Sequence, residues 1–279
     1  MQSFHSIAAD DSTPLSAGER AESPGRLAGE AWLARESDAV VAVSAAEADT
    51  VALRLGGPID RVRVVYPGVD GELFHPQPDY PAGSGYVVVA ARLQPLKGLD
   101  LAIEAVAAVA ESLRPQLVIA GDTSSDFNGY IDELTVLAAH NGVENSVRFV
   151  GPQSRTDLAA LLRGARAVLV PSHSETYGLV ALEAAASGVP AIVAASGGLR
   201  EAVDDGVTGV VLDSCDPEVW AVAIADVLAD PSLARRLAEG ARERAEHVDW
   251  PHSAEALVAV YRELVGSSAA GRQRDLAVA

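Results

Sequence analysis

The sequence predicts an α/β fold in which a doubly wound parallel sheet carries helices on both faces. Short apolar runs rich in β-branched residues alternate with helix-length segments rich in Ala, Leu and Glu. Strands that are covered on both faces are almost continuously apolar, which is typical of parallel sheets. The chain has 279 residues, 49% of them hydrophobic, which is enough for one large domain or two modest ones.

The predicted elements follow one another along the chain as strand and helix in turn. Helices should begin at Ser44, where Ser44 and Glu47 form a capping box, at Ser154 and at Asp216. After about residue 213 only helices are expected, and the last of these covers roughly residues 252–264. The predicted strands are Gln2–Ile7, Ala39–Val43, Val62–Tyr66, Tyr86–Ala90, Leu117–Ala120, Val147–Val150, Ala167–Val170, Ala191–Ala194 and Val210–Leu212.

Proline and glycine crowd into residues 67–85, which predicts a linker between two domains. The part before the linker offers about three strands, and so few strands are marginally stable alone. We therefore expect that the N-terminal domain is incomplete. The predicted organisation is an N-terminal remnant at residues 1–75, a main domain at 76–250, a helix at 251–265 and an irregular tail at 266–279.

Charge and composition exclude several classes of partner. The formal net charge of −18 repels phosphate backbones, so no nucleic acid is expected, and contact with an anionic membrane should be peripheral at most. The single cysteine, Cys215, allows no internal disulfide and fits a cytoplasmic protein. The histidines show no metal-ligand spacing, so no metal site is expected.

The first chemical motif is the loop "ARLQPLKG" directly after the strand Tyr86–Ala90. Ligands of doubly wound sheets bind beyond the carboxyl ends of the strands. Arg92 and Lys97 lie there, just before a helix, and two cations at a helix N-terminus can clamp a diphosphate. A solvated basic loop explains the same spacing equally well.

The second motif is "ETYGLVALE", which follows the strand Ala167–Val170 and places Glu175 and Glu183 eight residues apart. A helix that begins near Gly178 would turn the N–H groups of residues 176–179 toward a phosphate. Glu183, one turn into that helix, could accept hydrogen bonds from a ribose. The alternative is that these acids only stabilise the helix dipole or lie on the surface.

Together the two motifs resemble glycosyltransferase family 4 of the GT-B fold. The likeness covers about residues 40–264. The segments that carry it are "VVYPGVDGELFHP", "VVVAARLQPLKGLDLAIEA", "LVIAGD", "VRFVG", "AVLVPSHSETYGLVALEAAASGVPAIVA" and "GGLREAVDDGVTGVVL". The resemblance implies two Rossmann-like domains, of which the N-terminal one would be truncated here. It also implies a nucleotide-sugar site in the C-terminal domain.

The resemblance also implies a role for each residue that matches a family motif. Arg92 and Lys97 would bind the donor diphosphate, Glu183 the ribose, and Glu175 the hydroxyls of the donor sugar. His5, in a segment similar to the family's "HS" element, would lie near that sugar. The remaining contacts would come from Thr176, Tyr177, Gly178 and Leu179 for phosphate and sugar oxygens, and from Val150 and Gly151 for the base.

The implied reaction moves a hexose from a UDP- or GDP-sugar to an unknown acceptor, a sugar, lipid or small molecule, with retention of configuration. It needs neither a cofactor nor a metal, because cations and a helix end can stabilise the leaving diphosphate. For the chain to be active, a longer protein or an associated second chain is expected to supply the missing N-terminal part. The alternatives are a remnant that binds the donor without turnover, and a GT-B sugar-nucleotide 2-epimerase.

Overall fold

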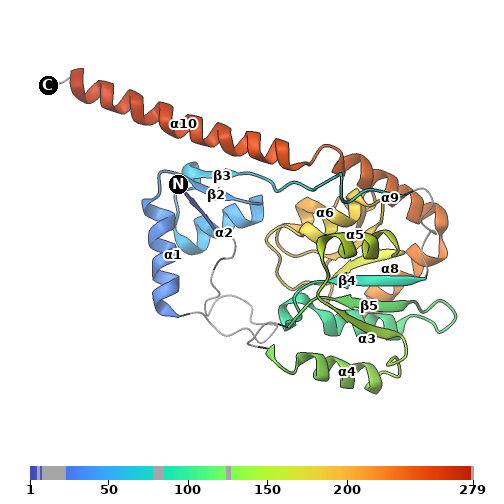
Figure 1. Ribbon diagram of the computed structural model, residues 1–279. Helices are drawn as coiled ribbons and strands as arrows, with labels where there is room; N and C mark the ends of the chain where they lie inside the picture. The colour runs from blue at the N-terminus through green and yellow to red at the C-terminus, as the bar shows by residue number, and fades with distance from the viewer. Residues whose placement is uncertain (5–6, 8–22, 78–84, 124–126, 278–279) are drawn as a thin grey trace. The chain divides into compact units, whose positions relative to one another are not determined.

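The computed structural model describes residues 1–4, 7, 23–77, 85–123 and 127–277, with side chains as far as Gly266 (Figure 1). These residues form two compact units. One unit contains the described residues up to Gly68 together with those from Val248 onward, and the other lies within Val69–His247. Among the described helices, none combines the length and the apolarity needed to cross a membrane.

The larger unit is built on a six-stranded sheet in which every neighbouring pair is parallel. The strand order is β6-β5-β4-β7-β8-β9, so the chain winds outward from β4 in one direction and from β7 in the other. This is the doubly wound order that the sequence predicts, with its switch point between β4 and β7. The strands are β4 (Tyr86–Ala90), β5 (Gln116–Ala120), β6 (Val147–Gly151), β7 (Ala167–Val170), β8 (Ala191–Ala194) and β9 (Gly209–Leu212).

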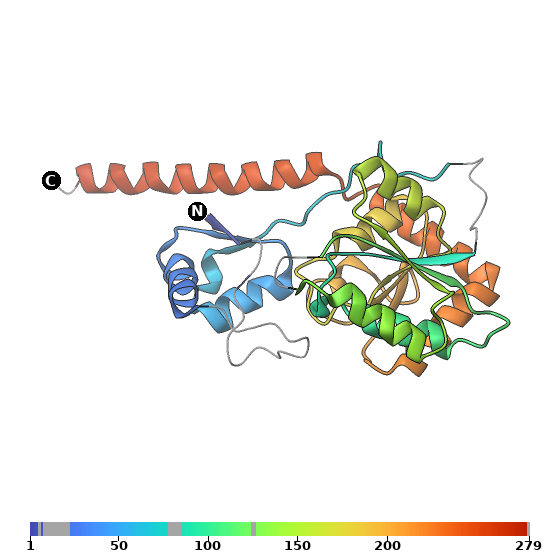
Figure 2. The same cartoon turned by 60° about the horizontal axis from the view of Figure 1, so that its bottom comes forward.

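Helices cover both faces of this sheet (Figures 1 and 2). On one face α3, α4 and α8 pack together with the strands, and on the other α5 and α6 contact β4, β7 and β8. Ser154 and Asp216 cap α5 and α8 through their side chains, as the sequence predicts. The helices are α3 (Leu99–Ala108), α4 (Tyr130–His140), α5 (Arg155–Arg163), α6 (Leu179–Ala186), α7 (Leu199–Ala202), α8 (Pro217–Ala229) and α9 (Pro231–Ala245).

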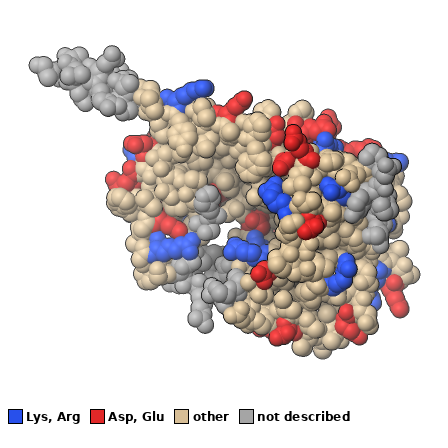
Figure 3. Space-filling view, viewed as in Figure 1, with Lys and Arg blue, Asp and Glu red and all other residues tan. Residues whose placement is uncertain are grey.

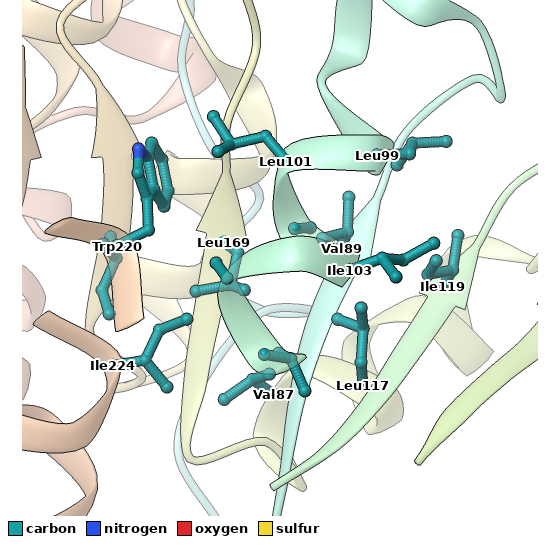
Figure 4. Packing of buried hydrophobic residues seen from close by; sticks show 14 of the residues in the cluster. Val87, Val89, Leu99, Leu101, Ile103, Leu117, Ile119, Leu169, Trp220 and Ile224 are labelled. Atoms are coloured by element: carbon teal, nitrogen blue, oxygen red, sulfur yellow. The ribbon is translucent and has the colours of Figure 1, made fainter. Parts of the chain in front are cut away.

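The core of the larger unit lies between the sheet and the α3–α8 layer (Figure 4). Val87 and Val89 of β4 both point toward this layer, where they pack with Leu101 and Ile103 of α3. Trp220 of α8 is completely buried, and its indole N–H donates to the carbonyl of Ser214 at 2.8 Å. Because the core fixes β4 and β7 side by side, the loops that follow these strands are held close together.

The smaller unit has a three-stranded parallel sheet in the order β1-β2-β3. Neighbouring residues of β2 point to opposite faces of this sheet. Val40 packs with α1 and α2, and Val41 packs with Val260 of α10. Ser44 caps α2 by accepting a hydrogen bond from the N–H of Glu47, and the carboxylate of Glu47 accepts one from the N–H of Val43, close to the predicted capping box. The elements are β1 (Gln2–Ser3), α1 (Pro24–Glu36), β2 (Val40–Ala42), α2 (Ala45–Leu55), β3 (Val62–Val64) and α10 (Trp250–Ala277).

The structure differs from the sequence prediction at the C-terminus. The helix predicted to end near residue 265 continues as α10 to Ala277, where an irregular tail is expected over 266–279. Ala, Gln, Arg and Leu in this stretch have high helix propensity, which can extend a helix that is already nucleated by packing on the sheet. Composition alone therefore underestimates the length of this helix.

Candidate functional site

The candidate site lies at the switch point, where the loops after β4 and β7 meet. The β4 loop ends in a 3-10 turn at Pro95–Lys97, and Gly98 then starts α3 with a left-handed φ of 63°. The β7 loop runs alongside, and the N–H of His173 donates to the carbonyl of Leu96 at 2.9 Å. An added Cβ on Gly98 would lie 2.1 Å from the carbonyl oxygen of Pro171, so the close approach of the loops requires glycine there.

Lys97 and Glu175 are brought together by these two loops. Their Nζ and Oε2 atoms lie 2.7 Å apart, and both side chains are more than 80% buried. In such surroundings a charge-assisted hydrogen bond is stronger than on the surface, because solvent screens it less. An ammonium has three N–H donors, so the bond to Glu175 leaves Lys97 two donors for a ligand.

Arg92 lies on the same loop as Lys97 and is exposed. Its guanidinium donates no hydrogen bond to any described residue. Arg92 can therefore bind a ligand without first losing another contact. On the face drawn in Figure 3 acidic and basic side chains are interspersed, so an anion site on this acidic protein depends on local cations. Arg92 and Lys97 are two such cations.

The start of α6 holds most of the remaining predicted residues. Gly178 is the N-cap in a left-handed conformation, Tyr177 is buried, Thr176 is half-buried, and Leu179 is exposed at the first helical position. The first N–H groups of an α-helix have no partner within the helix, so they can bind an anion. The structure thus places this helix start directly after the loop that carries Glu175.

Glu183 lies one turn into α6 and is half-buried. Burial raises the pKa of Glu183 to about 7, and the nearby guanidinium of Arg155 lowers it in part. No described residue donates a hydrogen bond to this carboxyl group. A half-buried carboxylate without donors is suited to bind the hydroxyls of a ligand.

The raised pKa of Glu183 predicts how stability depends on pH. The folded protein keeps a proton on Glu183 that the unfolded chain releases above about pH 4.5, so the free energy of unfolding should fall as the pH rises from there to about 7. The slope from this group is at most about 1.4 kcal/mol per pH unit. Urea unfolding at several pH values should show a smaller decline for Glu183→Gln, and identical declines in the two proteins would contradict the assignment.

Val150 and Gly151 end β6, on the far side of β5 from β4. At about 4.8 Å per strand, β6 lies two strand spacings from β4, whose loop carries Lys97, and three from β7, whose loop carries Glu175. The side-chain amide of Gln153 donates to both of their carbonyl oxygens, at 2.9 and 3.2 Å, which fixes this corner of the sheet edge. A ligand that touched both places would have to be extended along the edge.

Arg155 is a candidate that motif reasoning missed. It is the first residue of α5, where a cation opposes the helix dipole. It lies over the ring of Phe74 at 5.5 Å, approaches Asp70 at 4.0 Å and acts electrostatically on Glu183. The signal in the sequence is a cation at an unfavourable helix position on the same edge of the sheet, and such local conflicts mark functional sites.

The loop after β8 also supports the site, although the sequence motifs assign no functional residue to it. The N–H of Gly198 donates to the carbonyl of Glu175 at 3.0 Å, and the hydroxyl of Ser196 donates to the carbonyl of Ser172 at 2.7 Å. An added Cβ on Gly197 would lie 2.0 Å from the Glu175 carbonyl oxygen. This loop therefore positions the backbone that carries Glu175. His5, the remaining predicted residue, lies outside the described residues.

A six-stranded parallel sheet in this order, with charged side chains gathered at the switch point, defines the class of Rossmann-like α/β proteins that bind ligands at the carboxyl ends of their strands. The chain belongs to the family of glycosyl transferases group 1. The model of that family matches residues 71–244, and the model of Glycosyltransferase Family 4 matches residues 1–73. The resemblance seen in the sequence motifs is thereby confirmed.

Individual relatives agree with this assignment. The chain is 39% identical over 282 residues to a D-inositol 3-phosphate glycosyltransferase of Salinispora arenicola, covering 94% of this chain and 63% of the relative. It is 38% identical over 276 residues to the protein of that name from Saccharomonospora viridis, covering 94% and 64%. The chain thus spans less than two thirds of the length of these relatives.

Solved structures confirm the GT-B fold. The structure is similar to sucrose-phosphate synthase from Thermosynechococcus elongatus, with a TM-score of 0.82 and 27% identity over 95% of this chain and 67% of that one. It is also similar to Anabaena HepE in complex with UDP-glucose, with a TM-score of 0.80 and 24% identity over 95% and 71%. The second likeness is evidence for the fold only.

Proposed function

We propose that this chain binds a nucleotide-diphosphate sugar at the switch point and takes part in transfer of the hexose with retention of configuration. The observation that supports this best is the contact between Lys97 and Glu175. It joins the cation and the carboxylate that belong to two different motifs, directly before a helix start that can bind an anion. A solvated basic loop would not bury its lysine against the second motif.

Each residue then has a role that its position allows. Arg92, Lys97 and the first N–H groups of α6 stabilise the diphosphate as it leaves, so the reaction needs no metal. Glu183 accepts the ribose hydroxyls, and Glu175 holds the donor sugar through its hydroxyls. Val150 and Gly151 contact the base at the end of β6. His5 is proposed to act near the donor sugar.

The acceptor we propose is an inositol phosphate, because several relatives at 36–39% identity are named D-inositol 3-phosphate glycosyltransferases. Uridine is the proposed base, so the expected donor is a UDP-sugar. We place the reaction in the cytoplasm. Because the chain spans about 63% of the length of its Salinispora arenicola relative, donor binding and turnover are separate proposals, and each has its own test.

Donor binding is tested by titration calorimetry of this chain with UDP-glucose and GDP-mannose. We expect saturable binding of the uridine nucleotide, and a loss of at least tenfold in affinity for Glu183→Ala, because the ribose hydroxyls would lose the carboxyl group that accepts their hydrogen bonds. Glu239→Ala, on the exposed surface of α9, is the matched control. Equal affinity in Glu183→Ala and the wild type would show that the site is misplaced.

Turnover is tested by incubating the protein with inositol 3-phosphate and labelled UDP-glucose, UDP-GlcNAc or GDP-mannose. A glycosylated inositol phosphate is the expected product. Binding without any product, in this chain and in a version extended upstream, would favour the alternative of a donor-binding protein without turnover. Conversion of the donor to its 2-epimer would favour the isomerase.

A further inference from the structure

The helix α10 has two apolar faces, and the described residues of its own unit cover one of them. Val260 is buried against Ala39, Val41 and Val65, and Leu257 and Leu264 pack beside it. This face anchors the helix on the three-stranded sheet. The salt bridge between Arg63 and Glu263 adds a polar contact at its margin.

The second apolar face, which we name the α10 stripe, consists of Trp250, Ala254, Val258, Tyr261 and Val265. Their spacing of three and four residues places them in one row along a helix. The four larger side chains keep 40–70% of their surface exposed. A continuous row of large apolar side chains, unlike single exposed ones, marks an interaction surface.

Two opposite charges flank the α10 stripe on the same side. Glu255 and Arg262 are exposed and lie seven residues apart, which is two turns. Together with Ala254 and Val258 they line a shallow groove on the helix surface. The midpoint between Glu255 and Arg262 falls beside Val258, which is also the centre of the α10 stripe.

This arrangement is complementary to itself. If a second α10 packs antiparallel on the first around a two-fold axis at Val258, then Glu255 of each copy lies opposite Arg262 of the other. The two stripes cover one another, and two ion pairs flank them. A lipid surface fits less well, because the chain has a net charge of −18 and the flank of the stripe contains an acid as well as a base.

We propose that the α10 stripe is the docking surface for a second copy of this chain, which binds antiparallel to form a two-fold symmetric dimer. The interface is small, so its dissociation constant should be on the order of 10 µM. This inference is independent of the proposed function, because it involves no residue of the candidate site.

Sedimentation equilibrium of the chain at several concentrations in about 150 mM salt tests the dimer. The wild type should change from monomer to dimer with rising concentration. Val258→Glu, which brings two like charges together at the axis, should remain a monomer. Ala259→Glu adds the same charge one residue further along, away from the stripe, and should dimerise as the wild type does.

Charge reversal tests the antiparallel register. Glu255→Arg alone and Arg262→Glu alone should each weaken self-association about tenfold, because each places like charges opposite one another. An equimolar mixture of the two variants restores both ion pairs and should form heterodimers as tightly as the wild type. Failure of the mixture to recover would overturn the register.

A wild type that stays monomeric at 200 µM would overturn the proposal. The same holds if the monomer binds vesicles of anionic phospholipid and Val258→Glu abolishes that binding, since the stripe would then be a lipid-binding surface. Circular dichroism of each variant shows whether it is folded, and all the substituted positions are exposed.

Discussion

Replacing Lys97 with alanine is expected to lower the affinity for UDP-glucose by on the order of 30-fold, provided that the proposed donor site is correct. The ammonium supplies charge-assisted hydrogen bonds to the diphosphate, and the loss of about 2 kcal/mol corresponds to this factor. The substitution also leaves Glu175 without its partner, next to the phosphates, which repel it. Titration calorimetry measures the change directly.

The controls for Lys97 follow from its surroundings. Arg236→Ala on α9 removes the same charge from an exposed position and should bind like the wild type. Lys97→Arg keeps the charge and should retain part of the affinity. If Lys97→Ala binds UDP-glucose as well as Arg236→Ala does, Lys97 makes no contact with the diphosphate.

Lys97 is the only lysine of the chain, which allows a second and independent measurement. Amine acetylation can modify only this side chain and the N-terminal amine. UDP-glucose should slow acetylation at Lys97 and leave the N-terminus unaffected, as followed by mass spectrometry. Equal rates at Lys97 with and without the nucleotide would contradict the proposed contact.

Much of the fold could be predicted because its signals are local. The apolar runs that become β4, β7 and β8 have the predicted bounds, since parallel strands covered on both faces leave little room for polar residues. The contact between Lys97 and Glu175 could also be predicted from the sequence. Both residues follow strands of one parallel sheet, and such sheets gather the loops at one edge.

The parts that sequence reasoning missed depend on contacts between distant segments. Arg155 can be recognised as a site residue only in the folded chain, where Phe74, Asp70 and Glu183 lie close to it. The support that Gly197 and Gly198 give to Glu175 is likewise a backbone contact that no spacing in the sequence reveals. The C-terminal extension of α10 was missed for another reason. The residues there favour helices but are also common in disordered segments, so composition alone does not distinguish the two.

Gly98→Ala is the second substitution for which we expect a large effect, this time on stability and site together. Alanine at a φ of 63° is strained by about 1–2 kcal/mol. The new methyl group would also lie 2.1 Å from the Pro171 carbonyl oxygen, which is backbone and cannot rotate away. We expect a loss of about 3 kcal/mol or more, roughly 6 to 12 °C in Tm.

Gly142→Ala separates the two contributions to this loss. Gly142 has a similar φ of 67°, but no atom lies within 4 Å of its added Cβ. It should therefore show the conformational cost alone, about 1–2 kcal/mol, and bind UDP-glucose normally. Because relief of the clash at Gly98 must move the β4 loop away from the β7 loop, Gly98→Ala should also lose nucleotide affinity. Equal losses of Tm in the two variants, with binding intact in both, would mean that close contact between these loops is not what forms the site.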